Sequence, residues 1–299
     1  MDSIALLDGG TGRELRRMGA PFRQPEWSAL ALIEAPEFVT RVHEAYVAAG
    51  ANVITTNSYA VVPFHLGTER FARDGATLAS RAGQLAREVA AQAGRSIRVA
   101  GCLPPVCGSY RPDLFERRAA TPILETLITA LRPNVDLWLT ETLSKIEEAV
   151  LVRELLGAEP RPLWVSFTLA DGPDRLADPS LRSGESVVDA VRAAADLNVA
   201  ALLFNCSQPE VMGSAISIAA EELQRAKRSE RIALGVYANA FPPQDASAEA
   251  NSTLHDLRRE MTPECYLGWA AQWVRLGARI VGGCCGIGPE HIAALKREV

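Results

Sequence analysis

Eight short apolar segments, each followed by a longer segment with helical spacing, run through the 299-residue chain and constrain its fold more than any other feature. Strands that alternate with helices pair in parallel, because each helix returns the chain to the same edge of the sheet. Eight such units predict an α/β protein, a single (β/α)8 TIM barrel, with a doubly wound open sheet as the alternative. The expected strands are Ile4–Asp8, Asn52–Thr56, Ile97–Cys102, Leu137–Glu141, Leu163–Thr168, Ala201–Cys206, Ile232–Tyr237 and Arg279–Gly283.

The segments between these strands have recognisable helix ends. Pro36 and Pro263 stand where a first-turn proline is tolerated, and glycines 50, 94 and 157 follow helical segments. Because no internal repeat, low-complexity tract or linker divides the chain, we expect one barrel domain over residues 1–299. The expected helices include Glu37–Ala49, Thr77–Ala93, Ile146–Leu156, Val187–Leu197, Ser214–Lys227 and Pro263–Leu276.

Charge and composition exclude several classes of partner. A net charge of −5 and a pI near 5.6 argue against a surface for nucleic acid or anionic membranes. No apolar run approaches the roughly 20 residues of a membrane span, and the first residues do not read as an export signal. Six cysteines are too few for a disulfide scaffold, so we expect a cytoplasmic protein whose thiols are free or metal-bound.

Polar residues gather where the expected strands end. In a (β/α)8 barrel these carboxyl ends share one face, which carries the active site. Two long connections, residues 170–185 and 239–261, open on the same face, and loops of this length are usually functional or disordered. The polar strand ends are Asp8-Gly9-Gly10, Thr56-Asn57-Ser58-Tyr59, Glu141, Asn205-Cys206 and Cys284-Cys285.

The adjacent cysteines Cys284 and Cys285 lie in a glycine frame, and Cys206 ends another strand. Neighbouring residues of a strand point to opposite sides, so both thiols reach one ion only if the chain leaves the strand there. Glycines 282, 283 and 286 supply that backbone freedom. Two unrelated buried cysteines or a vicinal disulfide are the alternatives. We favour zinc, because three protein ligands leave a tetrahedral ion one open position for a substrate.

Several segments are similar to those of a known family. The string Gly282-Gly283-Cys284-Cys285-Gly286-Ile287-Gly288-Pro289-Glu290-His291-Ile292 resembles the signature of the homocysteine S-methyltransferase family. The resemblance covers nearly the whole chain in the right order, and members of the family use S-methylmethionine, betaine or, in larger cobalamin-dependent proteins, methyltetrahydrofolate. The other matching segments are Leu7–Leu15, Trp27–Leu30, His43–Ala51 and Ile54–Tyr59.

The resemblance implies a role for each residue of the site. It implies a (β/α)8 barrel whose zinc is held by Cys206, Cys284 and Cys285, with the sulfur of homocysteine in the fourth position. It also implies that Glu141 holds the amino group of the substrate. The backbone around Asp8, Gly9 and Gly10 then receives its carboxylate. By likeness to the betaine-using branch, Trp27 and Tyr59 line the donor pocket.

Each of these roles has a structural alternative. For Glu141 the alternative is a structural salt bridge, and for Asp8 it is a hydrogen bond to the turn that starts the first helix. For Trp27 and Tyr59 the alternative is packing without a role in binding. Asn205 is expected at the substrate or behind it, holding the loop that bears Cys206.

Elementary chemistry agrees with the implied reaction. A free thiol with a pKa of about 8.5 is only about 3% thiolate at neutral pH, and metal binding removes that penalty of about 2 kcal/mol. Holding sulfur and methyl carbon in line supplies up to about 7–11 kcal/mol, the larger share. A donor that is cationic at sulfur or nitrogen also suits aromatic faces.

We therefore predict a zinc-dependent methyltransferase that moves a methyl group from a small onium donor, S-methylmethionine by preference, to the thiol of L-homocysteine, giving methionine. The alternatives are a different thiol or selenol acceptor, and a non-enzymatic zinc-thiol sensor on the same barrel. Two departures from the family pattern are Cys102, for which packing is favoured, and Gly286, where S-methylmethionine-using relatives often carry arginine. Trp269 and Trp273, one helical turn apart, fit either a subunit contact or core packing, and core packing is favoured.

Overall fold

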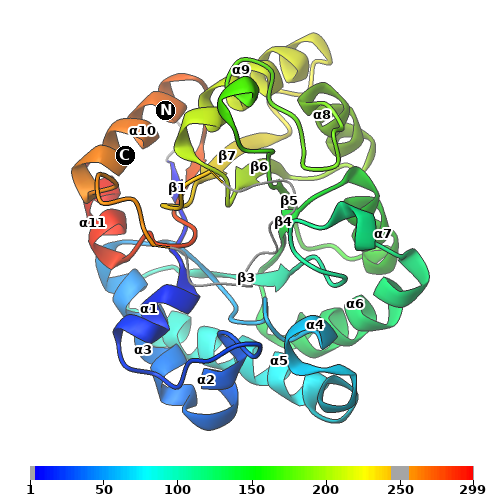
Figure 1. Cartoon of the computed structure of the whole chain (residues 1–299), viewed down its shortest axis with the longest axis vertical. Coiled ribbons are helices and arrows are strands. Elements are labelled where there is room, and N and C mark those ends of the chain that lie inside the picture. The colour runs from blue at the N-terminus through cyan, green and yellow to red at the C-terminus, as the bar shows by residue number, and fades with distance from the viewer. Residues whose placement is uncertain (1–3, 244–255, 299) are drawn as a thin grey trace.

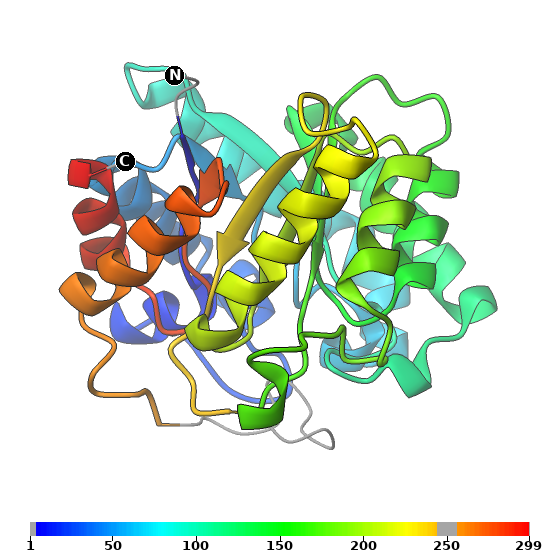
Figure 2. The same cartoon turned by 90° about the horizontal axis from the view of Figure 1, so that it is seen from above.

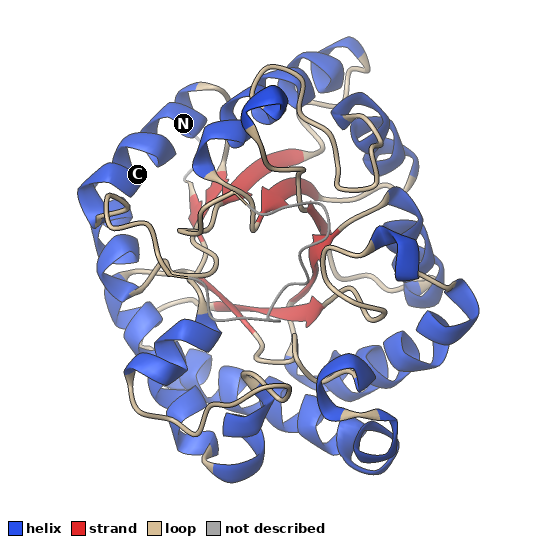
Figure 3. Ribbon diagram, in the orientation of Figure 1, coloured by secondary structure: helices blue, strands red, loops and turns tan. Residues whose placement is uncertain are grey.

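Eight parallel strands form one sheet in the computed structural model, which describes residues 4–243 and 256–298. The strand order is β1-β8-β7-β6-β5-β4-β3-β2, and a parallel bridge between Leu7 and Val53 joins the two ends of this order. The strands make an inner ring that the helices surround (Figure 1, Figure 3). This arrangement confirms the predicted (β/α)8 barrel and excludes the open sheet.

The strands lie close to their predicted positions. Most differ from prediction by one or two residues at an end, and Ile146–Leu156 is the helix predicted with both ends correct. The strands are β1 (Ala5–Leu6), β2 (Val53–Thr55), β3 (Arg98–Leu103), β4 (Leu137–Leu143), β5 (Leu163–Phe167), β6 (Ala201–Asn205), β7 (Ala233–Tyr237) and β8 (Ile280–Val281).

Helices follow the strands and cover the outside of the barrel. In the rotated view α9 lies outside the sheet beside β7 (Figure 2). The helices are α1 (Thr11–Arg17), α2 (Ala29–Glu34), α3 (Pro36–Ala49), α4 (Pro63–Leu66), α5 (Thr68–Gln92), α6 (Arg117–Leu131), α7 (Ile146–Leu156), α8 (Val187–Asp196), α9 (Pro209–Arg225), α10 (Pro263–Arg275) and α11 (Pro289–Glu298), with the 3-10 turns η1 (Pro112–Leu114), η2 (Arg132–Asn134) and η3 (Pro173–Arg175).

Two apolar clusters explain why this alternation folds into a barrel. The smaller cluster fills the interior of the strand ring and includes Leu7, Leu139 and Leu203, all nearly inaccessible to solvent. The larger one lies between strands and helices and includes Trp138 and Phe204. Because consecutive strand residues face these two clusters alternately, the strands are apolar on both sides.

The first and last strands are short because the chain leaves them to build loops. β1 and β8 have two residues each and pair through Ala5–Ile280 and Leu6–Val281. After β1 residues 8–10 leave the strand, and after β8 the chain turns at Cys285 and Gly286. The blue start and the red end of the chain therefore meet at one side of the ring (Figure 1).

Two expectations about loops and helices can be compared with the structure. The connection 170–185 is ordered by η3 and by bridges of Leu169 with Leu181 and of Ser180 with Ser186. Residues 244–255 of the second long connection lie outside the described part of the chain. In α10, Trp273 is fully buried against Tyr266, with ring centroids 5.7 Å apart, so it packs in the core. No helix among the described residues is long and apolar enough to cross a membrane.

Candidate metal centre and cleft

Three cysteine sulfurs from two strand ends lie together at the carboxyl face of the barrel. The Sγ atoms of Cys206, Cys284 and Cys285 are all within 4.8 Å of one another, and those of Cys206 and Cys285 are 3.9 Å apart. Three sulfurs bound at about 2.3 Å to a tetrahedral zinc ion would be roughly 3.8 Å apart. The observed spacing therefore fits one metal ion held by three thiolates.

The backbone at both strand ends departs from extended geometry to direct these sulfurs. Cys206 follows β6 with a φ of 53°, in the left-handed region that a non-glycine residue seldom adopts. Gly286 has a φ of 84° directly after Cys285. Glycines 282 and 283 have another reason for lacking a side chain: a Cβ would lie 2.4 Å from Cβ of Leu7 at Gly282, and 2.2 Å from Cγ2 of Ile287 at Gly283. Close packing, rather than φ, therefore requires these two glycines.

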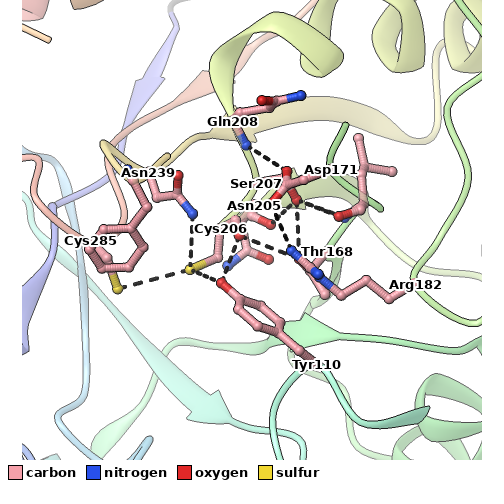
Figure 4. A network of polar contacts seen from close by, with 12 residues as sticks. Tyr110, Thr168, Asp171, Arg182, Asn205, Cys206, Ser207, Gln208, Asn239 and Cys285 are labelled. Atoms are coloured by element: carbon pink, nitrogen blue, oxygen red, sulfur yellow. Dashed lines mark hydrogen bonds and ion pairs between the residues drawn. The ribbon is translucent and has the colours of Figure 1, made fainter. Parts of the chain in front are cut away.

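A tyrosine supports the Cys206 sulfur from the β3 side. The Tyr110 hydroxyl donates to the Sγ of Cys206 at 3.0 Å and lies 2.8 Å from the carbonyl oxygen of the same residue, while the Asn239 amide lies 3.9 Å from that sulfur (Figure 4). Contacts with Cys284 and Cys285 hold the pKa of the Cys206 thiol well below its usual range, and contact with Cys206 raises the pKa of the other two. Cys206 is thus the first of the three to ionise.

Behind Tyr110 lies a buried ion pair that holds the ring in place. The guanidinium of Arg182 stacks on the Tyr110 ring at 3.9 Å and pairs with Asp171 at 3.0 Å. Asp171 also accepts from the backbone amide of Gln208, two residues after Cys206 (Figure 4). The loop 170–185 therefore braces the Cys206 loop. Sequence reasoning missed Tyr110, Asp171 and Arg182. It pointed only to the length of the loop that carries Asp171 and Arg182, and it did not single out the loop that carries Tyr110.

Two carboxyl groups lie in the same cleft as the sulfurs. Asp8 is buried and accepts hydrogen bonds from the backbone amide (2.7 Å) and the hydroxyl (3.0 Å) of Thr55. It therefore braces β2, and it does not cap the first helix as the alternative had it, because the cap of α1 at Gly10 has no side-chain bond. Burial raises the pKa of Asp8 to about 8 and that of Glu141 to about 7. A bound cation would oppose both shifts.

Cys102 contacts Glu141 directly. Its thiol donates to Oε2 of Glu141 at 2.9 Å, and burial and the carboxylate raise the pKa of Cys102 well above its usual range. The thiol therefore stays protonated and holds the carboxylate of Glu141. Sequence reasoning had favoured packing alone for this residue, which is indeed fully buried.

The backbone amides of the first loop are mostly engaged. The Asp8 amide donates to Val53 and the Gly10 amide donates to Ile287, at 3.1 and 3.0 Å. Of the three amides in the Asp8-Gly9-Gly10 turn, that of Gly9 is the one without a backbone acceptor in the described part of the chain. A Cβ on Gly9 would lie 2.3 Å from the Ile287 carbonyl, so the turn is packed tightly against the cysteine loop.

The cleft contains about 950 Å³ of empty space, a figure that includes space open to solvent. Trp27 lies on its wall with a φ of 50° and packs edge-on against Phe22. Tyr59 lines it as well, and its hydroxyl lies 2.6 Å from Ser109 Oγ. Arg13 and Phe241, which sequence reasoning did not single out, also line the cleft.

Asn205 does not line the cleft. Its side-chain oxygen accepts from the amide of Thr142 at 2.9 Å and from the hydroxyl of Ser166 at 2.7 Å, and its side-chain nitrogen donates to the hydroxyl of Thr142 at 2.9 Å. It is fully buried. These contacts are those of the second role considered for it, in which it holds the strand ends behind the cysteines.

Comparison with known proteins agrees with this geometry. A family model described as homocysteine S-methyltransferase matches residues 5–299. The homocysteine S-methyltransferase of Escherichia coli is 32% identical over 98% of this chain and 94% of its own length. Homocysteine S-methyltransferase 1 of Brassica oleracea is 29% identical over 99% and 93%. The metallated form of the Escherichia coli homocysteine methyltransferase superposes with a TM-score of 0.74 at 29% identity, covering 100% of this chain and 97% of that one. The chain belongs to the homocysteine S-methyltransferase family.

Proposed function

We propose that this protein transfers a methyl group from S-methylmethionine to the thiol of L-homocysteine, so that both molecules become methionine. One observation carries the proposal: three cysteine sulfurs that fit one metal ion lie in the same cleft as two carboxyl groups, Asp8 and Glu141. The cleft thus offers a place for a thiolate and a place for an ammonium group, which are the two ends of homocysteine.

Cys206, Cys284 and Cys285 would hold zinc. Zinc is the ion that three thiolates and one exchangeable position suit best, and a metallated relative supports a metal here. Bound there, zinc would supply the positive charge that keeps a substrate sulfur deprotonated at neutral pH. Tyr110 and Asn239 keep the Cys206 sulfur directed toward the position between the three sulfurs where the ion would lie.

The carboxyl groups and the first loop would orient homocysteine. Glu141, held by Cys102, and Asp8, held by Thr55, are deprotonated when an ammonium group lies between them, because the cation opposes the effect of burial on their pKa. The Gly9 amide is the donor that remains for the substrate carboxylate. These anchors fix the acceptor sulfur at one end of the cleft.

Aromatic side chains would receive the donor. The methyl group leaves a sulfonium centre, and Trp27 and Tyr59, which line the cleft, are aromatic residues of the kind that suits such a cation. Because both substrates are held, attack along the methyl–sulfur axis gains the advantage of orientation, up to about 7–11 kcal/mol.

The experiment is a donor and acceptor screen with the zinc-loaded protein. Homocysteine carrying ¹³C in its carbon chain is incubated with S-methylmethionine, betaine or other onium compounds, and labelled methionine is measured by mass spectrometry. Labelled methionine from S-methylmethionine is expected. Methylation of another thiol or a selenol, with none of homocysteine, would refute the acceptor. Zinc binding without any methyl transfer would instead favour a zinc-thiol sensor.

The remaining proposals concern setting and organisation. We propose that residues 1–299 act as one barrel domain and that the protein works in the cytoplasm. The support for the second statement is that the cysteines of the described residues are all free, including three that share one site. Such a cluster persists in a reducing compartment.

A further inference from the structure

The charges that line the cleft are unevenly distributed. The lining has five side chains that become negatively charged on losing a proton, namely Asp8, Glu141 and the three cysteines. Arg13 is the one Lys or Arg among the described residues of the lining. Both substrates of the proposed reaction are amino acids, so two carboxylates must be accommodated in a cleft whose other ionisable side chains are acids rather than bases. In the proposed function the Gly9 amide would receive one of them, because it has no backbone acceptor in the described part of the chain. A second partner for a carboxylate is required, and Arg13 is placed to supply it.

Helix stability does not explain an arginine at this position. Arg13 is the third residue of α1, whose N-terminus has no side-chain cap, and a cation in the first turn opposes the helix dipole. Arg16 and Arg17 lie in the last turn, where the dipole favours them, and Arg17 also pairs with Glu14. The helix dipole thus favours the basic residues of the last turn, whereas it opposes the charge of Arg13.

The surroundings of Arg13 orient its guanidinium within the cleft. The group lies over the Phe241 ring, 5.3 Å from the centroid, and both side chains line the cleft. Partial burial lowers the pKa of Arg13, although it stays charged, and the nearby Cys285 opposes this shift. A partly desolvated guanidinium held by an aromatic face suits paired hydrogen bonds to a carboxylate, which are strong and directional.

We propose that Arg13 binds the carboxylate of the methyl donor and thereby makes the site select onium donors that carry a carboxylate over those that do not. The inference rests on the proposed function. It assigns the two ends of the cleft differently: homocysteine is held by Glu141, Asp8 and the Gly9 amide, and the donor is held between the aromatic wall and Arg13.

The test compares S-methylmethionine with its carboxamide, in which a neutral group of nearly the same shape replaces the carboxylate. The wild-type protein is expected to have a lower KM for S-methylmethionine than for the amide. In Arg13→Gln the KM for S-methylmethionine should rise roughly 10- to 100-fold, the range for a lost hydrogen bond to a charged group. The KM values for the amide and for homocysteine should stay within about twofold, because Arg13 makes a hydrogen bond to a charged group in neither case.

Arg16→Gln is the matched control, since it removes the same charge from an exposed position of the same helix. Arg13→Lys keeps the charge without the planar fork and should retain part of the preference, so it substitutes if the glutamine variant fails to fold. An equal rise for both donors, a rise for homocysteine alone, or a wild-type protein without preference would each overturn the inference. A wild-type protein that methylates homocysteine from no onium donor refutes the proposed function itself, and this inference with it.

Discussion

Cys206 shows how much a single residue of this site depends on its neighbours. Its left-handed φ of 53° is costly for a side chain with a Cβ, and the surrounding contacts keep it there. Tyr110 bonds both its sulfur and its carbonyl oxygen, and the Arg182–Asp171 pair holds Tyr110 and the amide that follows. The orientation of this one sulfur is therefore set by a loop more than twenty residues away in sequence.

Removing the Tyr110 hydroxyl should weaken metal binding. In Tyr110→Phe the ring can keep its stacking with Arg182, while Cys206 loses the donor at 3.0 Å. We expect metal affinity to fall by about tenfold. This is the lower end of the range for replacing a residue that hydrogen-bonds a metal-binding side chain. Competition with a chromophoric chelator measures it. Tyr59→Phe is the control, because the hydroxyl of Tyr59 bonds Ser109 and no ligand, and an equal loss in both variants would contradict a specific role for Tyr110.

The raised pKa values of the two carboxyl groups predict how homocysteine binding depends on pH. Glu141 titrates near 7 and Asp8 near 8 in the empty cleft, so lowering the pH through this range protonates them and removes the attraction for the ammonium group. The KM for homocysteine should therefore rise as the pH falls from about 8 through 7. In Glu141→Gln the KM for homocysteine should be higher than in the wild type at neutral pH. The increase of this KM with falling pH should be smaller than in the wild type. Steady-state assays from pH 6 to 9 measure both.

Metal content provides the control for this variant. Glu141 accepts a hydrogen bond from Cys102, and among the described residues no hydrogen bond joins it to the three clustered cysteines, so Glu141→Gln should bind as much zinc as the wild type. If the substitution left both the KM and its pH dependence unchanged, Glu141 would have no part in holding the substrate. Loss of zinc together with the rise in KM would show instead that the carboxylate supports the metal site.

Among the structural elements, the loops after β1 and β8 determine whether the site can form. They lie against each other so closely that neither tolerates extra atoms. A Cβ on Gly10 would lie 2.5 Å from the carbonyl oxygen of Cys284, and the Gly10 amide donates to Ile287 across the same contact. Packing against the loop after β1 thus fixes the conformation of the loop that carries Cys284 and Cys285.

Gly10→Ala should therefore damage the metal site and the fold together. Separating the two loops is expected to lower the free energy of unfolding by about 1–3 kcal/mol, as for other overpacked contacts, and to reduce zinc content. The control is Gly268→Ala in α10, where a Cβ meets nothing within 4 Å and alanine should stabilise the helix by about 0.5–1 kcal/mol. Chemical denaturation and metal analysis measure both variants, and full zinc content in Gly10→Ala would contradict this account.

Sequence patterns predicted the strand ends better than the loops. The alternation of apolar strands and helices predicted the barrel, and with it the convergence of Asp8, Glu141 and the cysteines on one face, because parallel strands end at the same rim. Tyr110 and Arg182 escaped prediction because irregular loops have no periodicity from which a direction can be read. The contact of Cys102 with Glu141 depends on the register of β3 and β4, in which Cys102 pairs with Leu139. No sequence pattern determines this register.

At the scale of the whole molecule, the barrel and the metal site have separate sources of stability. The two apolar clusters fill the strand ring and the layer around it, and they involve residues from every strand. The sulfurs link only the ends of β6 and β8. The barrel should therefore remain folded when the metal is removed, unlike small domains that a metal alone holds together.

Chelation under reducing conditions tests this separation. The far-ultraviolet circular dichroism spectrum should be unchanged, while the melting temperature falls by a few degrees, on the order of 5 °C, because the folded state loses its bound ion. Adding zinc back should restore it. The variant Cys206→Ser should melt near the temperature of the metal-free wild type and respond little to zinc. Global unfolding on chelation would show that the ion holds the barrel itself.

The seam between β1 and β8 gives this barrel an uneven resistance to heat. These two strands pair over two residues, with further amide bonds from Ala5 to Arg279 and from Leu7 to Val281, whereas β4 and β5 share a longer ladder. Short ladders open first as thermal fluctuations grow. The strands that fray earliest are those whose following loops carry Gly10, Cys284 and Cys285. Catalysis should accordingly fail at temperatures where most of the ring is still intact, so that inactivation precedes melting.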